Sequence, residues 1–333
     1  MNTDNTAILE RIEACLTAAL PGDAYPDLAG PCGDLLRRGG KRWRSLLLVL
    51  GSSLAANNND EALLQSACKL TPLVEFAHTA SLIHDDIEDS SDTRRGAPAA
   101  HILWGVDTAL NAASWLYFEA AACIERAAAP PLQNRLYSLY MRELRQLHLG
   151  QAMDIAWHKD NAALPSLDEY LTMIRFKTGT LASLAMKTGM TAGGAADNII
   201  ERAGAIAADI GAAFQILDDV INLTMGNPGK KRGDDIVEGK KSFPVLLHTA
   251  VRPDDFPAIA ACFDQAKHEG PASPAVERCI ALLEQSGSIS KAAETARGMI
   301  TQASAGLKAL YPDRLRRAEP IIRLFEQFLT LKP

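Results

Sequence analysis

The sequence lacks closely spaced cysteines. Its six cysteines are scattered along 333 residues, and no two of them form a CxxC pair. In a chain of this size that spacing argues against a disulfide framework or a zinc site. It favours reduced thiols, most of them buried, in a cytoplasmic protein.

Signals for secretion and for membrane insertion are also missing. The N-terminal stretch "MNTDNTAILERIEACL" has no basic segment followed by an apolar one, so we expect no signal peptide. Apolar runs such as "LLLVLGSSLAA" are too short and too interrupted to span a bilayer. A net charge of −6 gives no general attraction to nucleic acid. We therefore expect no transmembrane segment and no nucleic-acid partner, and any polyanionic ligand needs a local basic cluster.

Alternating apolar and polar residues, the pattern typical of strands, are scarce. Apolar residues instead recur at spacings of three and four, and segments such as "AGAIAADIGAAFQIL" are apolar on more than one face. Hydrophobic residues make up 47% of the chain, enough for a large core. We predict an all-α protein, a single domain over residues 1–333 with roughly ten or more helices. Turns are expected where Pro and Gly cluster, at 21–31, 38–40, 96–98, 129–131, 192–194, 226–233, 269–274 and 312–313.

Acidic residues crowd the stretch "IHDDIEDSSDTRRG", which runs from Ile83 to Gly96. The residues before it repeat apolar side chains at helical spacing, so Asp85 and Asp89 stand one turn apart on one face of a helix. Carboxylates placed in this way repel each other. Mg²⁺ would compensate directly, since it takes one or two carboxylates and keeps positions for water and phosphate. For this motif alone, a solvated acidic helix face is an equally good interpretation.

A second acidic cluster changes that balance. "AFQILDDVIN" places Asp218, Asp219 and Asn222 after another apolar helical run. Two such clusters predict two walls of one metal-rich pocket. A diphosphate binds to metal ions and to basic side chains, and the chain supplies basic residues in several separate segments. They are Lys41, Arg42, Arg44, Arg94, Arg95, Lys177, Lys230, Lys231, Arg232, Lys240 and Lys241.

These motifs resemble those of the trans-isoprenyl diphosphate synthases, the polyprenyl synthetase family. "DDIED…RRG" resembles the first aspartate-rich motif of the family and "FQILDDVIN" the second. "GGKRWR", "GQAMD", "KTGT" and "GKKRGDDIVEGKKSFP" follow the family's order, and the resemblance covers about residues 35–250. "GQAMDIAWH" and "EGKKSFPVLLH" are most similar to geranylgeranyl diphosphate synthases of the eukaryotic type, which also have Asn at the place of Asn222. "GGKRWR" is closer to bacterial members.

The resemblance implies an all-α bundle around a deep central cavity, assembled as a homodimer. It implies a trinuclear Mg²⁺ site, with Mn²⁺ as an alternative ion. The implied reaction is the head-to-tail (1'-4) condensation of isopentenyl diphosphate with dimethylallyl, geranyl or farnesyl diphosphate. We expect a linear all-trans prenyl diphosphate, geranylgeranyl diphosphate (C20), as the product.

The resemblance also assigns roles to single residues. The implied metal ligands are Asp85, Asp86, Asp89, Asp218 and Asp219. The implied ligands of isopentenyl diphosphate are Lys41, Arg44, His78 and Arg95. Those of the allylic diphosphate are Arg94, Lys177, Gln215, Lys230 and Lys240. The groups expected to act in catalysis are Lys177, Thr178, Gln215, Asp85 and Asp218. Glu88 and Asp92 are expected to be surface charges.

Product length should depend on residues deeper along the helix that carries Asp85. Ala80 and Ser81 lie one turn earlier on about the same face, and both are small, so a growing chain can pass. Tyr117, Phe118 and His148 match positions that resemble the stop in eukaryotic-type C20 enzymes. Ordinary core packing of these three residues is the alternative.

Three other functions are open on the sequence. A class I terpene cyclase of the same fold would need no isopentenyl diphosphate site, and the basic residues assigned to that site argue against it. A longer-chain polyprenyl diphosphate synthase would differ only in the depth of its cavity. A regulatory subunit without activity should have lost metal or phosphate ligands, which this chain keeps.

Overall fold

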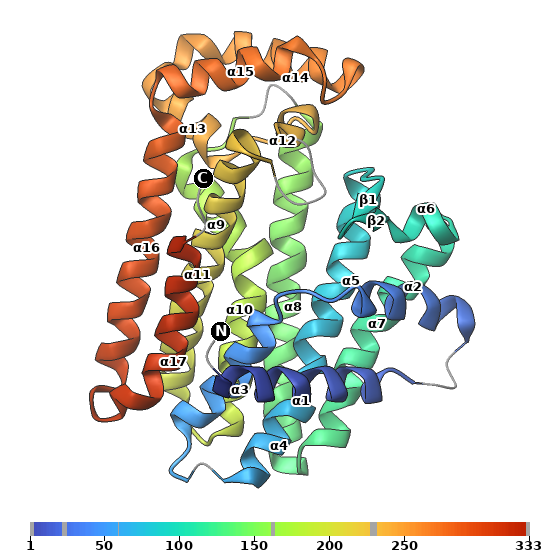
Figure 1. The fold of residues 1–333 in the computed structure, drawn as a ribbon, viewed down its shortest axis with the longest axis vertical. Coiled ribbons are helices and arrows are strands. Elements are labelled where there is room, and N and C mark those ends of the chain that lie inside the picture. The colour runs from blue at the N-terminus through green and yellow to red at the C-terminus, as the bar shows by residue number, and fades with distance from the viewer. Residues whose placement is uncertain (1–2, 22–24, 59, 161–163, 227–231, 331–333) are drawn as a thin grey trace. The chain divides into compact units, whose positions relative to one another are not determined.

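The computed structural model describes residues 3–21, 25–58, 60–160, 164–226 and 232–330. Almost all of their regular structure is helical, which confirms the all-α prediction (Figure 1). The α-helices are α1 (Thr3–Ala19), α2 (Pro26–Arg37), α3 (Trp43–Ala55), α4 (Glu61–Lys69), α5 (Pro72–Glu88), α6 (Ala100–Trp104), α7 (Val106–Ala127), α8 (Pro130–Lys159), α9 (Leu167–Ile174), α10 (Thr180–Ala192), α11 (Asp197–Thr224), α12 (Asp234–Val237), α13 (Phe243–Val251), α14 (Phe256–Glu269), α15 (Pro274–Gln285), α16 (Ser288–Leu310) and α17 (Leu315–Glu326). A π-helix, η1 (Arg175–Gly179), and three 3₁₀ turns, η2 (Pro253–Asp255), η3 (Pro312–Arg314) and η4 (Gln327–Thr330), complete the helical elements.

The helices group into two compact units, which are described separately. Unit 1 comprises Met1–Leu144, Leu181–Ala207 and Gly306–Leu324, and unit 2 comprises Arg145–Thr180, Ala208–Ala305 and Phe325–Pro333. The single domain expected over residues 1–333 stays a prediction. No helix in the described part of the chain is long and apolar enough to cross a membrane.

The core of unit 1 is built around α5 and α7, which pack side by side (Figure 1). Most of the apolar residues that predict an amphipathic helix are fully buried on α5, among them Leu73, Phe76 and Ile83. Burying each such side chain stabilises the fold by about 1.5–3 kcal/mol. Small residues on α7, such as Ala109 and Ala113, are also fully buried and let the two helices approach closely. This packing holds the end of α5, where the first acidic motif lies.

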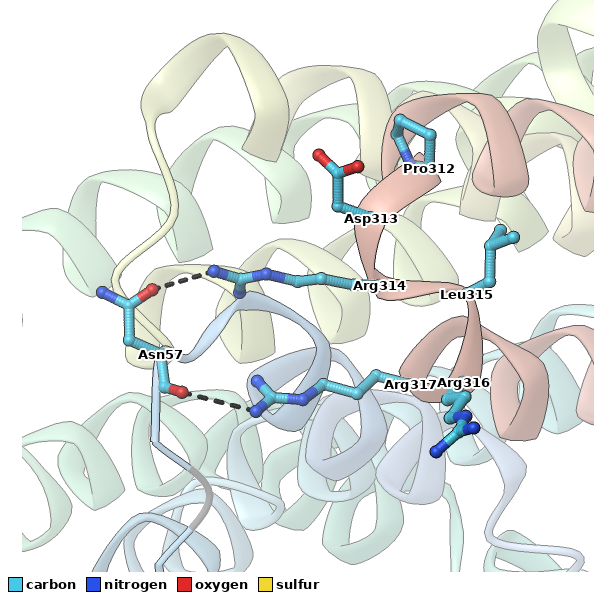
Figure 2. A pocket seen from close by; sticks show the side chains of 7 residues that line it. All are labelled: Asn57, Pro312, Asp313, Arg314, Leu315, Arg316 and Arg317. Carbon is cyan, nitrogen blue, oxygen red and sulfur yellow. Dashed lines mark hydrogen bonds between the residues drawn. The ribbon is translucent and has the colours of Figure 1, made fainter.

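The C-terminal end of α3 is held by two arginines of unit 1. Arg314 donates hydrogen bonds to the Ala56 carbonyl (2.9 Å) and to Asn57 Oδ1 (2.8 Å), and Arg317 donates to the Asn57 carbonyl (3.3 Å). Figure 2 shows both side chains reaching Asn57 across a surface pocket. The last carbonyls of a helix have no intrahelical donors and carry partial negative charge. The two guanidinium groups therefore stabilise this helix end.

The Pro- and Gly-rich stretch 21–31 was expected to be a turn, and this is wrong for its second half. There α2 begins at Pro26 and includes Pro31. Proline is tolerated at the first position of a helix because its missing N–H would have no intrahelical acceptor there. Pro31 lies inside α2, where it removes the N–H that would donate to the Asp27 carbonyl.

A short hairpin follows α5, although the sequence showed no strand pattern. Its strands β1 (Thr93–Arg94) and β2 (Ala97–Pro98) pair antiparallel. The two residues between them, Arg95 and Gly96, have φ angles of 53° and 75°. Positive φ at both central positions defines a type I′ turn, whose twist matches that of the paired strands. The turn makes the side chains of Arg94 and Arg95 diverge.

In unit 2, α14 and α15 form a helical hairpin (Figure 1). α12 packs against α14, while α13 packs against both α9 and α15. These contacts position the segment between α12 and α13, which includes Lys240 and Lys241.

Candidate active site

The first acidic motif occupies the last turn of α5. The backbone N–H of Asp89 donates to the Asp85 carbonyl at 2.8 Å, so the two residues lie one helical turn apart, as predicted. Negative charge at a helix C-terminus is unfavourable because the helix dipole is negative there, and the last turn of α5 contains no basic residue. Like charges at this spacing add to the cost. The motif therefore favours a bound cation.

Asp86, the second acid of the motif, is fully buried. Its Oδ1 accepts a hydrogen bond from Arg94 Nε at 2.7 Å and another from Arg94 Nη2. Burial raises the pKa of Asp86, and the adjacent Arg94 opposes that rise. Arg94 Nη2 also lies 3.5 Å from Asp85 Oδ2. Arg94 is thus placed at the acidic motif by the hairpin that follows it.

The donor set of this motif fits a magnesium site. Asp86 Oδ2 is buried and has no hydrogen-bond partner among the described residues, and carboxylate oxygens are the ligands that Mg²⁺ prefers. No three acidic, His or Cys side chains of the described residues converge as they would around a fully protein-bound metal. Mg²⁺ does not require this, since one or two carboxylates suffice when water and phosphate oxygens supply the rest.

The basic residues assigned to isopentenyl diphosphate come together in unit 1. Arg44, at the start of α3, donates from Nη1 to His78 Nε2 on α5 at 3.4 Å. Arg95 donates from Nη1 to the Leu35 carbonyl at 3.0 Å and approaches Gly40, where a Cβ would lie 3.2 Å from its Nη2. The lack of a side chain at position 40 therefore leaves room for the guanidinium. Lys41 follows on the exposed side of this segment.

The electrostatics of this cluster suit an anion. Burial and the nearby Arg95 lower the pKa of Arg44 to about 10. Burial and the neighbouring arginines lower the pKa of His78 well below its ordinary value, so the imidazole is neutral at physiological pH. Cations held close together at a partly accessible position attract a diphosphate and can donate charge-assisted hydrogen bonds to it. We refer to Lys41, Arg44 and Arg95, together with the neutral His78 between them, as the cationic cluster.

The residues assigned to product length differ in their surroundings. Ala80 is fully buried on α5, and Ser81 donates from Oγ to the His78 carbonyl at 2.8 Å. The ring of Tyr117 on α7 lies 5.7 Å from that of His84 on α5, next to the acidic motif. Phe118 is 74% exposed. His148, on α8 in unit 2, is exposed as well, and the assignment of all five residues stays a prediction.

Lys177 and Thr178 lie in the π-helix η1 of unit 2. Single π-helical turns are rare and occur frequently at functional sites. Lys177 Nζ lies 2.6 Å from Asp154 Oδ2. The aspartate at the end of "GQAMD" therefore forms an ion pair with the lysine of "KTGT". A Cβ on Gly150 would lie only 2.3 Å from the backbone nitrogen of Lys177. α8 and η1 approach so closely at this point that only glycine fits as the first residue of "GQAMD".

In the second acidic motif, as in the first, the two adjacent aspartates differ in exposure. Asp218 is partly exposed, whereas Asp219 is buried. Asp219 accepts hydrogen bonds from the Tyr170 hydroxyl, from the Phe243 N–H (3.0 Å) and from Gln215 Nε2 (3.2 Å). Burial raises the pKa of Asp219 to about 6 in spite of these bonds. In each motif the first Asp is accessible to a ligand and the second binds protein groups.

Asn222 has a structural role that explains why an amide is acceptable there. Its Oδ1 accepts a hydrogen bond from the Asp235 N–H at 3.3 Å, and its carbonyl accepts from the Gly233 N–H at 2.9 Å.

Lys240, further along the same segment, pairs with Glu238 at 2.5 Å. Lys230 and Lys231 lie outside the described residues. The two acidic motifs belong to different units, so their meeting in one pocket stays a prediction.

Sequence reasoning missed several residues that position this site. Glu75 is a buried acid on the apolar face of α5, one turn before His78, and an acid at such a position is itself a signal. Tyr170 had no comparable signal. The sequence placed Lys241 among the basic groups for a diphosphate, whereas the structure gives its side chain backbone acceptors instead. Lys241 is buried, and its Nζ donates to the carbonyls of Trp157 (2.8 Å) and Asp160 (3.1 Å), close to the end of α8. Phe214 lies edge-on to Phe328 at 5.2 Å, as a core residue would.

An all-α fold that carries paired aspartate motifs and a separate cationic cluster defines a class of enzymes that act on diphosphates. The family model for polyprenyl synthetase matches residues 26–280. The chain belongs to the polyprenyl synthetase family. This confirms the expected family and the expected class of enzyme, a prenyltransferase.

Individual relatives agree with this assignment. The chain is 34% identical over 261 residues to geranylgeranyl pyrophosphate synthase 2 of Zymoseptoria tritici, an alignment that covers 77% of this chain and 75% of the relative. It is 33% identical over 225 residues to the geranylgeranyl pyrophosphate synthase of Eremothecium gossypii, covering 66% of this chain and 68% of the relative. The crystal structure of geranylgeranyl pyrophosphate synthetase from Pyrococcus horikoshii is similar with a TM-score of 0.85 and 27% identity, covering 97% of this chain and 96% of that one.

Proposed function

We propose that the protein condenses isopentenyl diphosphate with an allylic diphosphate to give a linear all-trans prenyl diphosphate, and that the product is geranylgeranyl diphosphate. The cationic cluster is the observation that carries this proposal. A condensing enzyme must hold two diphosphates at once, and the cluster offers a second anion site beside the acidic motif. The names of the relatives from Zymoseptoria tritici and Eremothecium gossypii support the C20 product.

The proposed site needs a divalent metal, and Mg²⁺ is the ion we propose. Asp85, Asp89 and Asp218 would hold it, with Asp86 and Asp219 in support. Mg²⁺ would neutralise the allylic diphosphate as a leaving group. Arg94, Lys177 and Lys240 would donate charge-assisted hydrogen bonds to the phosphate oxygens of this substrate.

The protein's own groups account for the remaining chemistry. Lys41, Arg44, His78 and Arg95 hold isopentenyl diphosphate by its diphosphate, so that its double bond can attack C1 of the allylic partner. The C–O bond of that partner breaks, and the hydroxyl of Thr178 and the amide oxygen of Gln215 orient their dipoles toward the developing cation. The diphosphate that leaves can then take the proton that is lost when the new double bond forms.

Purified protein, Mg²⁺, isopentenyl diphosphate and each of dimethylallyl, geranyl and farnesyl diphosphate test the proposal, with products measured by mass spectrometry. A linear C20 diphosphate supports it. A hydrocarbon formed without isopentenyl diphosphate would instead identify a terpene cyclase, and a longer diphosphate would identify a longer-chain synthase. No product with any starter would contradict an enzymatic role and favour a regulatory subunit.

Metal dependence can be tested in the same assay. A chelator should abolish activity, and added Mg²⁺ should restore it. Asp85→Asn should lower activity strongly, because it removes a proposed ligand. Asp92→Asn, an exposed position in the same stretch, should leave activity unchanged and serves as the matched control.

Assembly as a homodimer and a place in the cytoplasm belong to this proposal as well. Large apolar side chains are exposed on α6 and α7, namely Leu103, Val106, Leu110 and Phe118. Exposed apolar side chains that lie close together are typical of protein interfaces. Sedimentation equilibrium should give twice the mass of the chain, and Leu110→Glu should lower it to that of one chain.

A further inference from the structure

Arg42 lies between two residues of the cationic cluster but points in another direction. Lys41 is exposed, whereas Arg42 is only 5% exposed and lies at the N-terminal cap of α3. Its backbone is left-handed, with φ 46° and ψ 23°. This conformation is unfavourable for a residue with a Cβ, so it persists only where surrounding contacts impose it.

The contacts of the Arg42 guanidinium come from three helices of unit 1. Nε donates to Glu13 Oε1 at 2.7 Å, Nη2 donates to the Leu36 carbonyl at 2.7 Å, and Nη1 donates to Glu75 Oε2 at 3.1 Å. Glu75 in turn accepts a hydrogen bond from Ser45 Oγ at 2.9 Å. The start of α3 is thereby tied to α1, to the end of α2 and to α5. All three guanidinium nitrogens are engaged with protein acceptors, so Arg42 is not arranged to bind substrate.

The same contacts control the cationic cluster. Arg44 follows Arg42 by two residues, and His78 follows Glu75 by three residues on α5. The Arg42–Glu75 pair therefore joins the two segments that bring Arg44 Nη1 within 3.4 Å of His78 Nε2. Glu75 also acts on Arg44 by its charge, since it raises the pKa of Arg44 against the lowering effect of burial. Glu75 thus favours the charged form of Arg44.

We infer that Arg42 and Glu75 are positioning residues for isopentenyl diphosphate: they place Arg44, His78 and Lys41 without touching the substrate. This inference rests on the proposed function, because it assigns the cationic cluster to that substrate. It goes beyond the ligand set that the family resemblance implies, which includes neither Arg42 nor Glu75.

The test compares substitutions by the Michaelis constants of the two substrates. Arg42→Met and Glu75→Gln should raise the KM for isopentenyl diphosphate by about ten- to a hundred-fold, as loss of a supporting contact commonly does. The KM for the allylic diphosphate and kcat should change by less than about threefold, because the residues that serve those steps keep their contacts. Arg42→Lys should restore part of the loss.

A glycine variant separates the side chain from the backbone. Arg42→Gly permits the left-handed conformation at no steric cost but removes the guanidinium. It should raise the KM for isopentenyl diphosphate as much as Arg42→Met does. A wild-type KM in Arg42→Gly would overturn the inference, because the backbone conformation alone would then suffice.

A matched control distinguishes positioning from general loss of stability. Lys187 and Glu143 form another buried ion pair of unit 1, with Nζ and Oε1 2.9 Å apart, outside the proposed site. Lys187→Met should lower the melting temperature without changing the KM for isopentenyl diphosphate. An equal rise of that KM in Lys187→Met, or a parallel rise of both substrates' KM in Arg42→Met, would overturn the inference.

Calorimetric titration of isopentenyl diphosphate without metal gives a readout that is independent of catalysis. Wild-type protein should bind, and Arg42→Met and Glu75→Gln should bind more weakly by the same factor as their KM rises. Equal binding by wild type and both variants would overturn the positioning role alone. Absence of binding and of condensation by wild type would overturn the proposed function, and with it the inference.

Discussion

The hydroxyl of Tyr170 on α9 donates a hydrogen bond to Asp219 on α11. Asp219 also accepts from Gln215 Nε2 at 3.2 Å, and Gln215 Oε1 accepts from Thr178 Oγ1 at 2.9 Å. Tyr170 therefore orients, through a buried carboxylate, the two groups that we propose face the allylic cation. This chain of hydrogen bonds lies within unit 2 and does not involve the cationic cluster.

Tyr170→Phe should lower kcat by about tenfold, as loss of a supporting hydrogen bond often does. The KM for isopentenyl diphosphate should stay unchanged, since its proposed ligands lie in unit 1. Stability should fall by about 1.5–3 kcal/mol, the usual contribution of a hydrogen bond to a charged group. Steady-state kinetics and denaturant unfolding measure both effects.

Tyr137→Phe is the matched control for that variant. The Tyr137 hydroxyl donates to Glu125 at 3.0 Å in an exposed position of unit 1. Its loss should change neither kcat nor stability measurably. A kcat for Tyr170→Phe equal to that of Tyr137→Phe would show that Asp219 and Gln215 keep their positions without the tyrosine.

Gly150→Ala tests the close approach of α8 to the π-helix η1. The added Cβ would lie 2.3 Å from Lys177 N and 2.7 Å from Phe176 Cβ, so one element must shift. Such overpacking costs about 1–3 kcal/mol and should displace Lys177, which lowers kcat. Gly298→Ala on α16 is the control: a Cβ there has nothing within 4 Å, and the change should stabilise the helix by about 0.5–1 kcal/mol. Wild-type kcat in Gly150→Ala would contradict the proposed dependence of Lys177 on this contact.

The part of the site that follows from the residue pattern alone is local, whereas the cationic cluster was expected from the family resemblance. Asp85 and Asp89 are four residues apart on an amphipathic helix, so their geometry follows from helical periodicity. Contacts between distant segments carry no such signal. Arg42 meets Glu75 across 33 residues, and Tyr170 meets its acceptor across 49.

Helix boundaries show a similar limit. Proline clusters predicted a turn over 21–31, yet Pro26 begins α2 and Pro31 lies inside it. Proline disfavours a helix interior locally, but the burial of Leu35 and Leu36 on the same helix outweighs that cost. The hairpin at Arg94 was missed because its strands have two residues each, too short for any periodic pattern.

Product length offers a test that separates two adjacent aromatic residues. Replacing both Tyr117 and Phe118 with Ala should lengthen the product beyond C20, and an unchanged product would contradict the assignment of both. Tyr117→Ala alone should account for most of the change, because Tyr117 lies beside His84 whereas Phe118 is 74% exposed. A longer product from Phe118→Ala alone would instead contradict the assignment of most of the change to Tyr117. Mass spectrometry of the products distinguishes these results.

Lys241 predicts a pH dependence of stability. It is buried, it donates to the Trp157 carbonyl near the end of α8 at 2.8 Å, and burial lowers its pKa from 10.5 to about 8. Below pH 8 both folded and unfolded chains hold the proton, and the folded chain bears the cost of a buried charge. Between pH 8 and 10.5 the unfolded chain binds more protons than the folded one, so this lysine makes the free energy of unfolding rise with pH.

Lys241→Met should remove that rise. Denaturant unfolding at pH values just below 8 and just below 10.5 should therefore show a wild-type advantage over Lys241→Met that grows with pH. Lys291→Met, at an exposed lysine of α16 that pairs with Glu294 at 3.4 Å, controls for loss of a positive charge at the surface. Its difference from wild type should stay constant over the same window. A constant difference for Lys241→Met as well would contradict this prediction. It would mean that the pKa of Lys241 is the same in the folded and unfolded chains, so that burial does not lower it.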